Sequence, residues 1–98
     1  MAGQPAPLTY DELLRLAERF AGQTLETVTG KRFTVELSPA KNCPVFIGSS
    51  GKRQTGGCKA AERVVERYNE THSLRPRDYE DVTRNASYFV GLLLRRDA

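Results

Sequence analysis

Hydrophobic and polar positions follow two different periods along the chain, and the change of period separates three parts. In the first part, apolar residues from Leu13 to Ala21 recur every three or four positions, which is typical of an amphipathic helix. Thr9 and Glu12 have the spacing of a capping box at its start, and Gly22 is suited to ending it. The first part is therefore predicted to be one helix with one apolar face.

In the middle part the period falls to two. Residues 24–37, TLETVTGKRFTVEL, have the pattern of a β-hairpin. We expect a three-residue loop over 29–31, because it pairs Leu25 with Val35 and keeps apolar residues on one face, whereas a two-residue turn does not. Two further short strands follow on either side of the turn GSSGK, at 45–47 and 53–55. The middle part is therefore predicted to be a β-meander of three to four strands.

The last part returns to the helical period. Residues 59–69 are predicted to form one helix, and the chain from Pro76 to Arg95 is open to two interpretations. A regular apolar stripe, with no glycine or proline at 83–85, favours one long helix. The stripe consists of Tyr79, Val82, Ala86, Phe89 and Leu93. The alternative is a helix-turn-helix with a break at 83–85 and a recognition helix from Ala86.

This order of elements predicts an α+β domain: a small antiparallel sheet preceded by one amphipathic helix and followed by two helices packed on one face. In the alternative interpretation the last segment is helix-turn-helix-like. The 98 residues suffice for one domain, which we place at 9–98 after a disordered lead-in over 1–8. No apolar run is long enough to span a bilayer, and the first residues lack the features of a secretory signal. A cytoplasmic protein without membrane contact is expected.

Charge is distributed unevenly along the chain. The formal net charge is +3, but residues 31–59 contain six lysines and arginines against a single acid, Glu36. A basic segment in an otherwise balanced domain favours a polyanionic partner. The competing interpretation is a solvated loop surface that carries this charge without a partner.

The basic segment contains the stretch IGSSGKR, residues 47–53, which has some features of a phosphate-binding P-loop. The P-loop pattern needs a glycine where this chain has Phe46, and a serine or threonine where it has Arg53. A nucleotide site is therefore excluded. What remains is a small, hydroxyl-bearing turn whose backbone amides and cations suit contact with a nucleic-acid backbone.

These features together predict a small module that binds nucleic acid, most favourably double-stranded DNA, through a basic hairpin and loop surface. The expected contact residues are Lys31, Arg32, Ser49, Ser50, Gly51, Lys52, Arg53, Gln54, Arg84 and Asn85. Arginine, glutamine and asparagine are types that also read base edges. The alternative function is a protein–protein interaction or regulatory domain that binds no nucleic acid and accepts a partner strand at 53–55.

The candidate catalytic and metal-binding residues are sparse. His72 is the only histidine and has no neighbouring nucleophile in sequence, and the acids Asp78, Glu80 and Asp81 are typical of a helix start. Cys43, Cys58 and His72 are too few for a structural zinc site. Two reduced thiols are favoured, with a disulfide across a hairpin as the alternative. We expect no enzyme activity, no cofactor and no metal.

Overall fold

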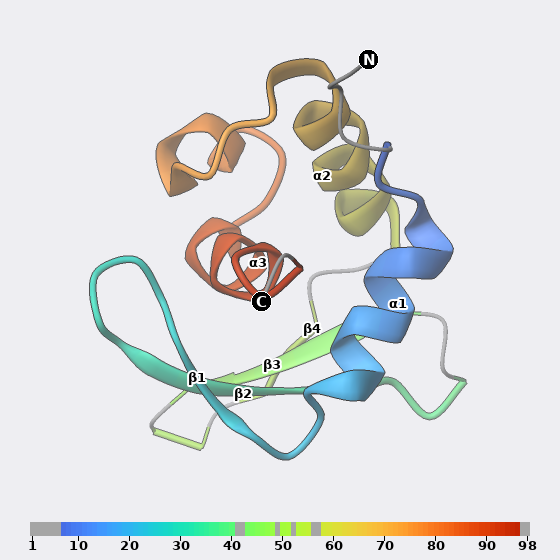
Figure 1. The fold of residues 1–98 in the computed structure, drawn as a ribbon. Coiled ribbons are helices and arrows are strands. Elements are labelled where there is room, and N and C mark those ends of the chain that lie inside the picture. Colours follow the sequence, from blue (N-terminus) through green and yellow to red (C-terminus); the bar gives the residue numbers. More distant parts are fainter. Residues whose placement is uncertain (1–6, 41–42, 49, 52, 56–57, 97–98) are drawn as a thin grey trace.

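The computed structural model describes residues 7–40, 43–48, 50–51, 53–55 and 58–96. It confirms the α+β class. One helix comes first, an antiparallel four-stranded sheet in the order β1-β2-β3-β4 follows, and the remaining helices come last. The helices lie on one side of the sheet (Figure 1). The elements are α1 (Tyr10–Arg19), β1 (Thr24–Glu26), β2 (Arg32–Leu37), β3 (Pro44–Gly48), β4 (Arg53–Thr55), α2 (Cys58–Thr71), η1 (Pro76–Tyr79) and α3 (Ala86–Leu93).

The predicted cap of α1 forms in part. The Glu12 amide donates a hydrogen bond to Thr9 Oγ1 at 3.0 Å. The Glu12 carboxylate binds Arg96, whose Nε lies 2.6 Å from Oε2, and so ties α1 to the chain that follows α3. Packing begins before this cap, because Leu8 is buried and exchanges two hydrogen bonds of 2.8 Å with the Asn69 side chain. The expected disordered lead-in thus includes a core residue at its end, and residues 1–6 lie outside the described part of the chain.

The first hairpin has the predicted loop length in a different register. Leu25 pairs with Phe33, two residues away from the expected partner. The Thr27 amide donates to the Lys31 carbonyl at 2.8 Å, and Thr27 Oγ1 accepts from the Lys31 amide at 3.0 Å. The three-residue loop is therefore 28–30, with Gly30 at φ +89°, and Thr27 and Lys31 close it just outside the strands, since β2 begins at Arg32. A shift of two residues keeps every side chain on its predicted face.

Helix α3 lies in the middle of the domain and packs directly on the sheet. Six of its eight residues are buried: Ala86, Phe89, Val90, Gly91, Leu92 and Leu93. A Cβ atom at Gly91 would lie 2.8 and 2.9 Å from two ring carbons of Phe33 and 3.1 Å from the Glu26 carbonyl oxygen. Phe46 contacts Phe89 edge to face at 4.9 Å between ring centroids. A helix that is apolar on nearly all sides is a core helix.

The expectation of one long helix from Pro76 to Arg95 is wrong. The chain forms η1, turns over 80–85, and starts α3 at Ala86, where the alternative interpretation placed a helix start. The backbone amide of Asn85 donates to Thr83 Oγ1 at 3.0 Å, and this local hydrogen bond competes with the backbone hydrogen bonds of a continuous helix. The Tyr79 hydroxyl donates to the Ser73 carbonyl at 2.7 Å and anchors η1. The residues of the apolar stripe are therefore divided among η1, the turn that contains Val82, and α3.

A guanidinium on α2 fixes the turn between η1 and α3. Arg67 donates to the Asp78 carbonyl at 2.6 Å and to both carboxylate oxygens of Asp81 at 3.0 and 2.9 Å. These hydrogen bonds to Arg67 hold the pKa of the Asp81 carboxyl below its usual range.

Among the residues that the structure describes, no helix is long and apolar enough to cross a membrane.

Replacing Gly91 with alanine is expected to destabilise the domain. The added methyl group would overlap the buried Phe33 ring, and overpacking of this kind costs about 1–3 kcal/mol, which outweighs the gain of about 1 kcal/mol in helix propensity. We expect a net loss of up to about 2 kcal/mol in urea unfolding. Leu94→Ala, at an exposed position next to α3, is the control and should change stability by less than about 0.5 kcal/mol. A more stable Gly91→Ala variant would show that the contact is loose.

The Asp81 pair should contribute to the pH dependence of stability. Because the pKa of Asp81 is lowered in the folded state, its stabilisation is present above the ordinary carboxyl pKa of about 4 and is lost as the pH falls through the lower folded pKa. Asp81→Asn should therefore be less stable than the parent protein near neutral pH, and the difference should vanish in acid. Urea midpoints from neutral pH downward test this, with Glu80→Gln as the charge control. A difference that persists unchanged in acid contradicts the assignment.

Candidate nucleic-acid interface

Two turns from different hairpins lie at the same end of the sheet. Phe33 at the start of β2 pairs with Gly48 at the end of β3. The loop before β2 and the turn after β3 therefore project from one end, as the ribbon shows (Figure 1). The register brings the predicted residues Lys31 and Arg32 to the same end as Ser50, Gly51 and Arg53, and all five are exposed.

The β3–β4 turn is closed by its own backbone. The Gly51 amide donates to the Gly48 carbonyl at 2.9 Å, and Gly51 has φ +84°. This amide is therefore engaged within the turn, and the proposed array of anion-binding amides does not include it. Ser50 stands exposed at the turn. Ser49 and Lys52, which were also predicted contacts, lie outside the described residues.

An aromatic side chain from α3 supports the strand that leads into this turn. The Tyr88 ring stacks on Phe46 at 5.6 Å between centroids and tilts against Phe33 at 5.0 Å. Its hydroxyl reaches Gly48, where a Cβ atom would lie only 2.8 Å from the oxygen. Glycine at this position lets the tyrosine approach the backbone. Tyr88 thus positions the end of β3 and couples the turn to the core helix.

Acidic residues accompany the cations of the sheet. Arg53 forms an ion pair with Glu36 across β3, and Arg32 stands directly opposite Glu26 in the β1–β2 register. The side chains of Arg53 and Glu36 are 57% and 38% exposed. An ion pair this exposed adds little stability, so its main effect is on where the guanidinium points. The excess positive charge of the segment is therefore partly offset by neighbouring carboxylates.

The two residues of the last segment that were predicted to contact bases, Arg84 and Asn85, differ in their exposure. Arg84 is exposed, but Asn85 is only 7% exposed, and its backbone amide donates to Thr83 Oγ1 within the turn. A side chain this buried offers little surface to a partner, so Asn85 stays a predicted contact without support from its exposure. Helix α3 is too deeply buried to act as a recognition helix. Gln54 lies in β4, and the structure describes its backbone alone.

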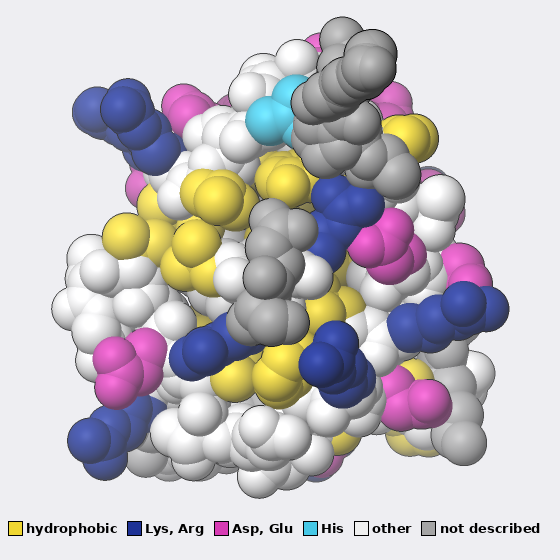
Figure 2. Space-filling model, viewed as in Figure 1, with side chains coloured by type: hydrophobic (Ala, Val, Ile, Leu, Met, Phe, Trp, Pro, Cys, Tyr) yellow, Lys and Arg dark blue, Asp and Glu magenta, His cyan; other side chains and the backbone are white. Residues whose placement is uncertain are grey.

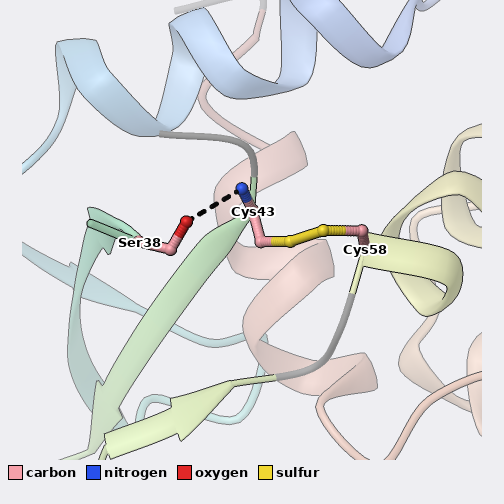
Figure 3. Close-up of a disulfide and its surroundings, with 3 residues drawn as sticks. All are labelled: Ser38, Cys43 and Cys58. Carbon is pink, nitrogen blue, oxygen red and sulfur yellow. Dashed lines mark hydrogen bonds between the residues drawn. A yellow bond between two sulfur atoms is a disulfide. The ribbon is translucent and has the colours of Figure 1, made fainter. Parts of the chain in front are cut away.

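The two cysteines form a disulfide, which corrects the expectation of two reduced thiols. Their Cα atoms lie 5.3 Å apart. The pairing of β3 with β4 explains this proximity, because it brings the residue before β3 next to the start of α2. Figure 3 shows the bond between the start of β3 and the start of α2, with the Cys43 backbone amide donating to Ser38 Oγ at 3.3 Å.

The residues considered for catalysis have structural contacts. Asp78 accepts a hydrogen bond from the Ser73 hydroxyl, Asp81 binds Arg67, and the His72 ring stands edge to face against Tyr68 at 5.6 Å between centroids. His72 also ends α2 with φ +53°. Within the described part of the chain, no group of three or more histidine, cysteine or acidic side chains is arranged to hold a metal ion.

The surface charge is dispersed. On the face drawn in Figure 2, lysine and arginine side chains are spread over the surface, and several stand beside acidic ones.

Comparisons of the chain with protein-family models, with curated proteins and with solved structures find no match.

Sequence reasoning missed two contributors to the site, Tyr88 and Glu36. The alternation of Glu36 with Val35 and Leu37 hinted at its face, but the partners of both residues are distant in sequence.

The contact between Tyr88 and Gly48 predicts an energetic coupling. Gly48→Ala places a methyl group against the Tyr88 hydroxyl, and Tyr88→Phe removes the atom it would meet. We expect the cost of Gly48→Ala, measured by urea unfolding, to be smaller by about 1 kcal/mol in the Tyr88→Phe background than in the parent protein. Additive effects of the two substitutions would show that the tyrosine does not constrain the start of the turn.

Proposed function

We propose that the protein is a small nucleic-acid-binding module, with double-stranded DNA as the favoured partner and no catalytic activity of its own. The observation that carries the proposal is the register of the sheet, which brings the cations beside two turns to one exposed end. Lys31 and Arg32 directly follow the first turn. Ser50 lies in the second turn, and Arg53 begins the strand after it. Cations and hydroxyls gathered at a protruding end suit contact with phosphate oxygens.

The charges of this end imply moderate affinity with little sequence preference. Phosphate contacts set affinity and its dependence on salt, whereas sequence is read by contacts to base edges. The exposed ion pair with Glu36 favours one direction of the Arg53 side chain without fixing it. A guanidinium has five donors, so the pair leaves donors for a second partner. In this proposal Lys31 and Arg32 supply electrostatic attraction, and Arg53 is an oriented hydrogen-bond donor.

An interaction domain for another protein is the second candidate, and the sheet order favours it. Strand β4 lies at an edge of the sheet, with β3 on its other side. Such an edge accepts an extended segment from a partner by adding a strand. This mode would depend on backbone hydrogen bonds and would show little dependence on salt, so the same titration separates the two candidates.

The DNA proposal predicts a specific loss of salt dependence. Binding of a short labelled duplex, followed by fluorescence anisotropy between about 50 and 200 mM salt, should weaken in the Lys31→Ala/Arg32→Ala variant. The slope of log affinity against log salt should fall by about 1–2, because each lost phosphate contact reduces it by about 0.9.

The matched control is Arg63→Ala/Arg77→Ala, which removes two exposed cations from α2 and η1, apart from the two turns (Figure 1). It has the same change in net charge and should keep most of the slope. Equal losses in both variants would indicate nonspecific attraction. Binding that does not respond to salt in the parent protein would remove the DNA proposal and favour a protein partner.

A further inference from the structure

The disulfide closes the β3–β4 hairpin at the end opposite to its turn. Cys43 directly precedes β3 and Cys58 is the first residue of α2, with a sequence separation of 15. Cys43 has a second anchor, because it exchanges backbone and side-chain hydrogen bonds of 2.9 and 3.3 Å with Ser38. Strand β4 is a three-residue edge strand. Opening the disulfide would therefore leave Cys43 in place and loosen β4 and the start of α2.

The surroundings of the bond favour its reduction. Both cysteines are half-buried, so solvent thiols can approach them. Cys58 begins a helix of 14 residues with no acid in its first turn, and Lys59 follows it directly. A helix N-terminus and a neighbouring cation stabilise a thiolate, and a stabilised thiolate leaves readily in thiol–disulfide exchange. The Cys58 sulfur is thus the better leaving group of the two.

We infer that the Cys43–Cys58 disulfide is a redox latch that controls the nucleic-acid surface. This inference rests on the proposed function and on the half-buried, helix-terminal position of Cys58 beside Lys59. In the oxidised form the hairpin is closed, and β4 holds Arg53 on Glu36 beside the turn. In the reduced form β4 detaches more often, Arg53 loses its favoured direction, and affinity for DNA falls.

The exchange step is balanced with a dithiol as the reductant. One thiolate of the dithiol attacks the Cys43 sulfur and forms a mixed disulfide, and the electron pair of the broken bond leaves on the Cys58 sulfur, which takes a proton. The second thiol of the dithiol then attacks the first dithiol sulfur, which is bonded to Cys43 in the mixed disulfide. This step closes the cyclic disulfide and releases Cys43, which takes a proton and becomes a thiol. Two electrons and two protons pass to the protein, and the dithiol becomes a cyclic disulfide.

Three measurements on the full chain test the latch. The first is the reduced fraction in a glutathione buffer at cytosolic poise, which should exceed one half. The second is hydrogen exchange, in which the amides of β4 should exchange at least about tenfold faster after reduction while α1 and α3 stay protected. The third is duplex affinity, which should fall about fivefold on reduction and in the Cys43→Ser/Cys58→Ser variant.

A matched pair of variants tests the chemistry of the leaving sulfur. Lys59→Glu places an acid in the first turn of α2 and should lower the reduced fraction several-fold, whereas Arg63→Glu makes the same charge change beyond that turn and should not. A bond that stays oxidised in the buffer, or β4 exchange that is unchanged by reduction, overturns the latch. Equal DNA affinity of two forms that both bind overturns its control of the surface. If neither form binds DNA, the proposed function fails, and exchange and reducibility decide the latch alone.

Discussion

The close approach of α3 to β2 at Gly91 and Phe33 is the contact on which the rest of the structure depends. The absence of a side chain at Gly91 lets the helix backbone come within van der Waals distance of the Phe33 ring and the Glu26 carbonyl. Helix α3 is buried on nearly all sides, because both the sheet and α1 pack against it. Small domains bury a limited core, so one well-packed helix carries a large share of it.

The same helix links the core to the candidate interface. Tyr88 lies one turn before Gly91 and stacks on Phe46, so its hydroxyl reaches the backbone of Gly48 at the start of the β3–β4 turn. The packing of α3 on the sheet therefore also positions the β3–β4 turn. The disulfide restrains the other end of the same hairpin. The hairpin is therefore supported by apolar packing near its turn and by a covalent bond at its base.

The fold offsets part of the positive charge that composition assigns to residues 31–59. The basic segment is a property of the sequence between residues 31 and 59, but folding places Glu26 opposite Arg32 and pairs Glu36 with Arg53. Electrostatic attraction from the end of the sheet is consequently weaker than six cations would imply. Of these acids, Glu36 contacts a guanidinium directly, that of Arg53.

The sequence by itself determined the kinds of element, their order and the faces of their strands. The start of α1, the strands at 53–55 and around 45–47, and the shared face of Leu25 and Phe33 follow from period and capping, which act over a few residues. Only the tertiary structure decided the exact hairpin register, the break before α3, the burial of Asn85, the pairing of Arg53 and the disulfide. The register and the Arg53–Glu36 pair depend on how the strands meet in the sheet, whereas the burial of Asn85 and the disulfide depend on helices packing against it. The break before α3 combines a local hydrogen bond with the burial of that helix.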